Sequence, residues 1–193
     1  DVFTVNKTST TFNNKNVGTG KAVTVSGISL TGTDAGNYTL TSTTATGTAS
    51  ITVKSLTITP TVTDKQYDGN TTAAATLTDS RISGDVFTVN KTSTTFNNKN
   101  VGVAKTVTVS GITITGTDAG NYTLTSTTAA GTASITVRSL TISSTASDKE
   151  YDGNTTATAT LTDNRITGDV FTVNKTSTTF NNKNIGIGKA VTT

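Results

Sequence analysis

The sequence predicts an all-β protein built from tandem β-sandwich modules. Thr accounts for 52 of the 193 residues, and its branched Cβ suits the surface of a pleated sheet. Charged residues make up only 14% of the chain, against about 25% in typical globular proteins. A helical bundle would need more charged residues on its surface, yet Glu150 is the single glutamate. The composition therefore favours strands.

The chain also repeats itself. The segment DVFTVNKTSTTFNNKN starts at Asp1, Asp85 and Asp169, so the period of the repeat is 84. The segment TGTDAGNYTLTSTTA starts at Thr31 and Thr115, with the same spacing and no insertion. Self-similarity at a fixed period is typical of repeat architectures, in which each repeat contacts its neighbours. We therefore expect modules of this period, stacked end to end as a rod.

The limits of one module follow from a change in side-chain parity. Ile135 and Val137 share one parity, whereas Leu140 and Ile142 take the other. Because side chains alternate between the faces of a strand, this switch marks a break in register at Arg138–Ser139. The preceding copy has the same switch at Lys54–Ser55. The predicted division is the C-terminal part of one repeat over 1–55, a complete repeat over 56–139, and the N-terminal part of the next over 140–193.

Short alternating segments give the expected strands of the complete repeat, about seven in all, which is the spacing of a sandwich. Each segment has apolar residues at every second position, and Thr72, Thr76 and Thr78 are expected on the outer face. The inward positions, in chain order, are Leu56, Ile58 and Val62 with an interruption at Pro60; Ala73, Ala75 and Leu77; Phe87 and Val89; STTF ending at Phe96; Val107 and Val109; Ile112 and Ile114; Tyr122 and Leu124; Ile135 and Val137.

The segment TDAGNYTLT resembles the corner of immunoglobulin-type sandwiches. Those domains carry Asp-x-Gly-x-Tyr-x-Cys where the sixth strand begins, and the Tyr hydroxyl bonds back to backbone a few residues upstream. Here Asp118, Gly120 and Tyr122 take the first three places, and Leu124 stands where the Cys would be. The resemblance implies an Ig-like sandwich in which a buried Leu replaces the disulfide.

A second motif recurs once per repeat, as DKQYDGNTTA from Asp64 and as DKEYDGNTTA from Asp148. Asp-Gly favours a type I′ turn, whose two central residues both need positive φ. The structural residues of this motif are Tyr67, Asp68 and Gly69, with Tyr151, Asp152 and Gly153 in the next copy. Together with Asp-Ala-Gly-Asn-Tyr further on, it resembles the YDG-type and MBG-type tandem repeats of very large bacterial surface and secreted proteins, including hemagglutinin-like adhesins. The resemblance implies a stalk or adhesin role.

Two turns bring oxygen-bearing side chains together and are weak candidates for calcium. Calcium takes six to eight oxygens, and a complete loop usually ends in a bidentate acid, which neither turn has. The residues concerned are Asp64, Asp68 and Asn70 at one turn, and Asp118 and Asn121 at the other. Plain capping of the turn is the competing interpretation, and no cofactor is expected.

The remaining composition bears on catalysis and on partners. Without His or Cys there is no triad or thiol dyad, so we expect no enzymatic activity. Lys105 is a candidate for a covalent Lys–Asn crosslink, with a β-bulge as the alternative interpretation. Lysines are scattered without stacking aromatics, which argues against nucleic acid, and no apolar run approaches the roughly 18 residues of a membrane span.

The sequence is therefore interpreted as a structural stalk of a bacterial cell-surface adhesin or extracellular filament. Its expected partners are the neighbouring repeats of the same chain, while a distal domain would contact a host surface, a glycan or other cells. The alternative is a binding module whose sandwich surface recognises a glycan or a host protein. Near-identical copies favour the stalk, since a binding module usually differs from its neighbours.

Overall fold

The computed structural model describes residues 1–193, and the chain is all-β as predicted. Besides strands, the regular elements are two single-turn 3-10 helices, η1 (Ala35–Asn37) and η2 (Ala119–Asn121). Neither has the length and apolarity that a membrane-crossing helix requires. The predominance of Thr, Val and Ile accounts for this choice, because β-branched side chains pack better on a pleated surface than on a helix.

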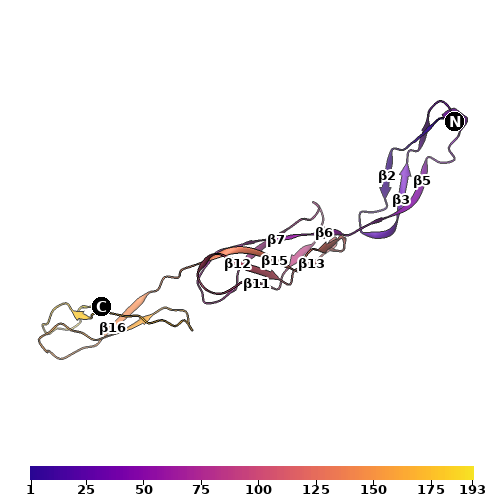
Figure 1. Ribbon diagram of the computed structural model, residues 1–193. Coiled ribbons are helices and arrows are strands. Elements are labelled where there is room, and N and C mark those ends of the chain that lie inside the picture. Colours follow the sequence, from indigo (N-terminus) through magenta and orange to yellow (C-terminus); the bar gives the residue numbers. More distant parts are fainter. The chain divides into compact units, whose positions relative to one another are not determined.

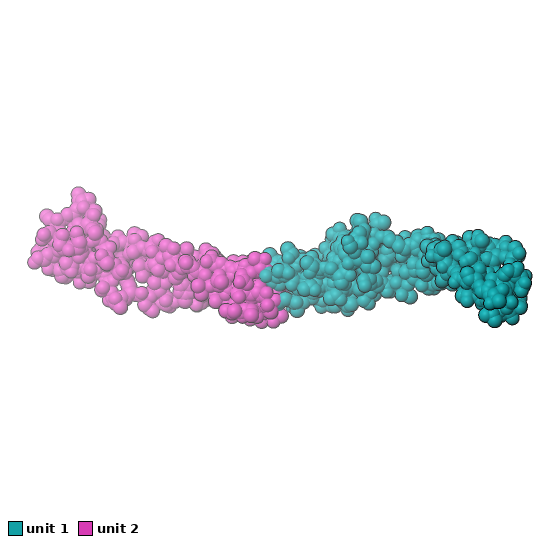
Figure 2. Space-filling model, turned by 90° about the horizontal axis from the view of Figure 1, so that it is seen from above, with its two compact units in different colours: residues 1–62, 74–94, 108–131 teal, residues 63–73, 95–107, 132–193 magenta.

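The chain forms two compact units, coloured separately in Figure 2. Unit 1 contains residues 1–62, 74–94 and 108–131, and unit 2 contains residues 63–73, 95–107 and 132–193. Each unit therefore combines segments from two successive sequence repeats. The limits 56–139 for a single folding module stay a prediction.

The N-terminal segment contains seven strands: β1 (Thr4–Asn6), β2 (Ser9–Phe12), β3 (Gly18–Ser26), β4 (Ser29–Thr31), β5 (Thr44–Ile51), β6 (Lys54–Leu56) and β7 (Ile58–Val62). Strand β3 lies between β2 and β5 and is antiparallel to both (Figure 1). Strand β1 pairs with β4 in the antiparallel sense. These pairings put the DVFTVNKTSTTF segment against the strands that follow it.

The central part of the chain contains eight strands: β8 (Lys65–Gln66), β9 (Ala75–Asp79), β10 (Thr88–Asn90), β11 (Ser93–Phe96), β12 (Gly102–Ser110), β13 (Thr113–Thr115), β14 (Tyr122–Leu124) and β15 (Thr128–Thr136). One sheet has the order β11-β12-β15-β8, and β10–β13 and β7–β9 are antiparallel pairs. Strand β14 runs parallel to β6. The expected strand ending at Phe96 and the turn at Ser110–Gly111 are both present.

The last segment contains four strands: β16 (Ile142–Ala146), β17 (Ala159–Asp163), β18 (Thr179–Phe180) and β19 (Val191–Thr192). They form two antiparallel pairs, β16–β17 and β18–β19. The β16–β17 hairpin corresponds in sequence to β7–β9, with pairing at the same five positions of each strand.

The core of unit 1 joins residues that are far apart in the sequence. Its buried members are Leu56, Ile58, Phe87, Val109, Ile112 and Tyr122. The Phe87 and Tyr122 rings lie 5.1 Å apart, centre to centre. All six are inward positions of the alternating segments, so sequence parity correctly identified the buried face. On β9, likewise, Thr76 and Thr78 are exposed while Leu77 is half-buried.

Three local expectations need correction. Pro60 lies inside β7, opposite Leu77, rather than interrupting it; β7 pairs only with β9, and an edge strand tolerates a residue without an N–H. The break near Lys54–Ser55 falls two residues earlier, because β6 already begins at Lys54. Val137 is 73% exposed and does not share the buried face of Ile135. The later break does span Arg138–Ser139, between β15 and β16.

A β-bulge interrupts strand β3, and β12 has a positive φ at the matching position. In β3 the register shifts between Gly18 and Lys21, where Gly20 has φ of 58°. The matching residue in β12 is Ala104, the only non-glycine residue with positive φ (49°). A positive φ at Ala104 is what the bulge interpretation of Lys105 predicts.

Candidate functional site at the repeat junctions

Lys15 links two successive sequence repeats within unit 1. Its Nζ lies 2.6 Å from Asp85 Oδ1 and 3.0 Å from Asp118 Oδ1. The two carboxylates are largely covered, with side-chain exposures of 9% and 10%. Lys15 belongs to the NNKN loop after β2, whereas both aspartates come from the following repeat. The loop of one repeat therefore places a positive charge on an acidic pair of the next.

The acidic pair is held in place by its own repeat. Asp85 Oδ2 accepts a hydrogen bond of 2.6 Å from the Tyr122 hydroxyl, and Asp118 Oδ2 accepts one of 2.8 Å from the Val86 N–H. The Tyr122 oxygen in turn accepts the Ile82 N–H at 2.9 Å. The expected bond from the tyrosine to backbone exists, but its partner lies 40 residues upstream rather than a few.

Two uncharged contacts reinforce the same junction. The Val17 N–H donates to Asn121 Oδ1 at 2.9 Å, and Asn121 Nδ2 donates to Asn16 Oδ1 at 3.3 Å. Asn121 ends the 3-10 turn η2, in which Gly120 has open space where a Cβ would be. Leu124 follows in β14, where it is half-buried opposite Leu56. The corner motif thus supplies both an anchor for its own core and an acceptor for the preceding repeat.

The NNKN loop is shaped by the bulge lysine. In the second copy, Asn98 Oδ1 accepts the Asn100 N–H at 3.0 Å and the Lys105 Nζ at 2.6 Å. These bonds close the loop on itself and leave Lys99 at its tip. Lys105 therefore has a positioning role, as a hydrogen-bond donor to Asn98.

The second junction, inside unit 2, uses the same lysine–aspartate pair one repeat further along the chain. Lys99 Nζ lies 3.2 Å from Asp169 Oδ1. The same oxygen accepts a 2.6 Å hydrogen bond from the Tyr67 hydroxyl, and the Lys99 ammonium lies 5.9 Å from the centre of the Tyr67 ring. A tyrosine and a lysine of one repeat therefore meet on one carboxylate oxygen of the next.

The Tyr-Asp-Gly turn differs from the predicted type. Gly69 has φ of 81°, but Asp68 is not among the residues with positive φ, so the turn is not type I′. Asp68 Oδ1 caps the Asn70 N–H at 3.2 Å, as expected of a turn aspartate. Asp152 caps Asn154 in the same way, and Gly153 has φ of 78°.

Of the calcium candidates at the first turn, Asp68 and Asn70 are brought together, whereas Asp64 bonds elsewhere. Lys65 Nζ occupies the turn instead, 2.7 Å from Asp68 Oδ1 and 3.0 Å from Asn70 Oδ1. Asp64 Oδ1 accepts the Ser134 N–H at 2.6 Å. Asp118 and Asn121 make the junction contacts described above. No group of three or more acidic side chains with metal-ligand geometry is present.

Charge pairing shifts the titration of the junction residues. The Lys15 hydrogen bond lowers the pKa of Asp85, with a further contribution from Tyr122. The Val86 N–H, followed by Lys15, lowers the pKa of Asp118. The Tyr67 hydroxyl lowers the pKa of Asp169. Burial, followed by the nearby Asp85, raises the pKa of Tyr122. The junction therefore favours ionised carboxylates.

Sequence reasoning missed an arginine that holds the start of the DVF segment within its own repeat. Arg81 forms two bonds with Asp79, of 2.8 and 2.6 Å, and donates to the Phe87 carbonyl at 2.8 Å. Its guanidinium lies 3.9 Å from the Phe87 ring centre. Arg165 repeats this arrangement with Asp163 and Phe171. The recurrence of Asp-x-Arg-Ile in both copies was the available signal.

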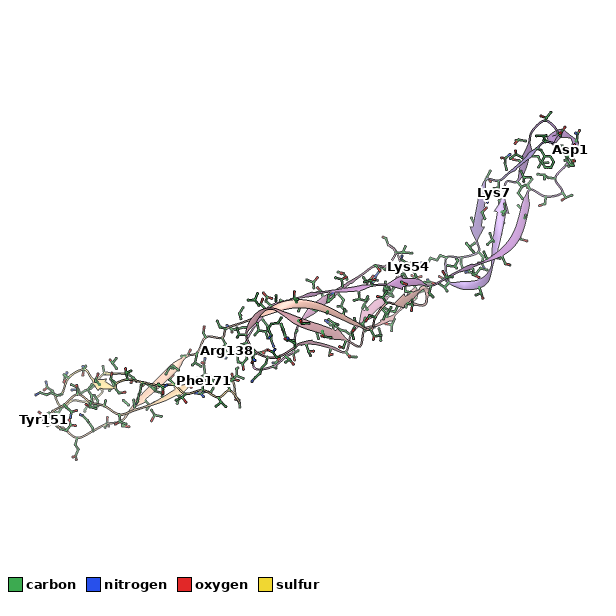
Figure 3. The ribbon with its side chains drawn as sticks, in the orientation of Figure 1. Asp1, Lys7, Lys54, Arg138, Tyr151 and Phe171 are labelled. Atoms are coloured by element: carbon green, nitrogen blue, oxygen red, sulfur yellow. The ribbon has the colours of Figure 1, made fainter.

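The last copy of the YDG motif is more exposed than the first. Tyr151 is 63% exposed, and Lys149 binds Asp152 at 2.7 Å as Lys65 binds Asp68. Arg138 and Phe171 both line an open hollow of unit 2, near each other in Figure 3. In unit 1 the residue that matches Phe171 is Phe87, which is buried and packs against Tyr122.

Comparison with known proteins assigns the whole chain to one family. The YDG domain model matches residues 1–46, 52–129 and 136–193. Neither characterised proteins nor solved structures give a significant match. The three matched segments cover almost all of the sequence, and the chain therefore belongs to the YDG domain family.

Proposed function

We propose that the chain is a structural stalk segment of a bacterial cell-surface adhesin or extracellular filament, built from 84-residue Ig-like modules. The observation that carries the proposal is the recurrence of one ion pair at two junctions. Lys15 binds Asp85, and Lys99 binds Asp169, each 70 residues further along the chain. A repeated link between successive repeats is what an array under tension needs, because each repeat then contacts its neighbours in one fixed way.

The Ig-like assignment is supported by the arrangement around Tyr122. A 3-10 turn precedes a strand that begins with the tyrosine, and the tyrosine hydroxyl accepts a backbone N–H. The antiparallel pairs β7–β9 and β10–β13 cover a core drawn from both ends of the repeat. Antiparallel pairing is typical of Greek-key sandwiches, whereas the parallel β6–β14 pair departs from that pattern.

In this proposal the chain has a mechanical role and carries out no catalysis. Its partners are the neighbouring repeats, and it works outside the bacterial cell or on its surface. A distal region of the same protein would contact the host, a glycan or other cells. Near-identical repeats support this assignment over a binding module, which usually differs from its neighbours.

Small-angle scattering on the 193-residue polypeptide tests the proposal. Strands of seven or eight residues rise about 3.3 Å per residue, so each repeat with its turns should advance the chain by about 35–45 Å. The polypeptide should then extend over about 90 Å, with a radius of gyration of about 26 Å, against about 16 Å for a compact domain. A value near the compact figure contradicts a stalk, and binding of the polypeptide to a glycan array would support the binding module instead.

A further inference from the structure

The two YDG turns have nearly the same conformation but different surroundings. Gly69 and Gly153 have φ of 81° and 78°, and both turns have the same lysine–aspartate pair. Tyr67 is half-buried, with its hydroxyl on Asp169, whereas Tyr151 is 63% exposed. Figure 3 places Tyr151 at the outer edge of a loop. The following repeat contacts the first turn through Asp169, and the second turn has no counterpart of that contact within residues 1–193.

Gly69 faces that following repeat directly. A Cβ on Gly69 would lie 2.6 Å from Cγ2 of Ile166, closer than non-bonded carbon atoms approach. A Cβ on Gly153 would meet nothing within 4 Å. Ile166 is half-buried beside Gly69, while the matching Ile82 is 56% exposed. Gly69 therefore both adopts a positive φ and leaves room for the Ile166 side chain.

We propose that the YDG turn is the docking surface for the next repeat of the chain. Tyr67 donates its hydroxyl hydrogen to Asp169, and Gly69 leaves the space that Ile166 fills. The partner that fits this surface is a repeat with an aspartate at the start of its DVF segment and a branched apolar side chain three residues before it. This deepens the stalk proposal, on which it rests for its biological meaning.

The aspartate that begins each DVFTVNKTSTTFNNKN segment makes the docking directional through its hydrogen bonds. At both junctions, Oδ1 of this aspartate faces the preceding repeat. Asp85 Oδ1 accepts a hydrogen bond from Lys15, and Asp169 Oδ1 accepts hydrogen bonds from Tyr67 and Lys99. Oδ2 faces the aspartate's own repeat: Asp85 Oδ2 accepts a hydrogen bond from the Tyr122 hydroxyl. Tyr38 makes the same Oδ2 bond to Asp1. One carboxylate oxygen therefore bonds to the preceding repeat, and the other bonds to the corner tyrosine of its own repeat.

The glycine variants test this docking with an internal control. The chain has no cysteine, so spin labels can be attached at Thr106→Cys and Thr160→Cys, two exposed strand positions on either side of the docked turn in unit 2. Electron–electron double resonance on the full polypeptide then measures the distance distribution between them. Gly69→Ala and Gly153→Ala both place Ala at a φ near 80°, but only the first meets Ile166.

We expect Gly69→Ala to lose the single narrow distance peak, and Gly153→Ala to keep it. Adding Ile166→Ala to Gly69→Ala should restore the peak, because the clashing Cγ2 is removed. Equal distributions for the two glycine variants, or no rescue by Ile166→Ala, would overturn the docking. If Gly69→Ala unfolds the chain, circular dichroism detects the unfolding, and the variants Tyr67→Phe and Tyr151→Phe then test the docking.

The tyrosine pair is the milder test. Tyr67→Phe removes only the hydroxyl that Asp169 accepts, so the distance peak should broaden, and more so when Lys99→Gln is added. Tyr151→Phe should leave the peak unchanged, since Tyr151 makes no such bond. No difference between Tyr67→Phe and Tyr151→Phe contradicts the proposal. A narrow native peak together with a compact radius of gyration would reject the stalk while leaving the docking intact.

Discussion

Lys15 Nζ lies 2.6 Å from Asp85 Oδ1, and one repeat later Lys99 stands in the same relation to Asp169, at 3.2 Å. The contact spans 70 residues in each case, which is less than the period of the repeat. Each lysine nevertheless lies in one copy of the DVF segment and its aspartate at the start of the next copy. The ion pair is a property of the array and not of a single repeat.

The first prediction concerns this ion pair. Lys15→Gln leaves the Asp85–Asp118 pair without its counter-charge, so the melting temperature at low salt should fall. Salt screens exposed charges, and Lys15 is 61% exposed, so the difference from the native chain should shrink in 1 M salt, where the Debye length is about 3 Å. Lys183→Gln is the matched control, because Lys183 occupies the same place in its repeat and takes part in none of the ion pairs. Equal losses in both variants would argue against the junction.

The second prediction concerns the core of unit 1. Leu56 is fully buried, whereas Leu140, at the matching position, is 43% exposed. Leu56→Ala should lower the free energy of unfolding by about 2–5 kcal/mol, as other buried leucines do on truncation. Leu140→Ala should have a much smaller effect, because less surface is lost from contact. Urea denaturation of both variants measures the difference, and similar losses would mean that the last segment has a core as tight as that of unit 1.

The residues of this core show how far the sequence could be used. Alternation identified the inward positions Phe87, Val109 and Ile112, because period-two patterning reports which face of a strand is buried. It does not report which distant segment will cover that face. The link from Lys15 to Asp85 was missed for that reason. Residue identity also does not fix the backbone angles of a turn. The Asp-Gly pair suggested a type I′ turn, although only Gly69 has positive φ.

The third prediction concerns acid. Pairing with Arg165 lowers the pKa of Asp163 to about 2, and the pKa values of Asp85 and Asp169 are also lowered. A carboxyl group with a lowered pKa stabilises the fold above its unfolded pKa of about 3.9, and that stability is lost as the pH falls through the folded value. The melting temperature should therefore be flat above about pH 5 and fall between about pH 4 and 2. Asp163→Asn should reduce the fall, and a constant melting temperature down to pH 2 would contradict the ion-pair account.

The fourth prediction concerns the bulge in β12. Ala104 has φ of 49°, where a Cβ clashes with backbone at a cost of about 1–2 kcal/mol, and the matching residues Gly20 and Gly188 avoid that clash. Ala104→Gly should therefore stabilise the chain by up to about 1 kcal/mol, after the greater entropy of glycine in the unfolded state is deducted. Gly20→Ala should have the opposite effect. Thermal unfolding of both variants checks this, and destabilisation by Ala104→Gly would mean that the bulge is relaxed.

The last prediction concerns the limits of a folding module. The segment 56–139 contains all six buried residues of the unit 1 core, together with β8, β11, β12 and β15 of the four-stranded sheet. The segment 1–84 has the same length but contains only Leu56 and Ile58 of this core, because the other four members lie later in the chain. We therefore expect 56–139 alone to unfold in one cooperative transition, with a steeper denaturant dependence than 1–84, because it exposes more apolar surface on unfolding. Calorimetry and urea titration of the two polypeptides make the comparison. Equal cooperativity and stability would place the module boundary elsewhere, because a fragment that lacks four of the six core residues should not match the fragment that contains them all.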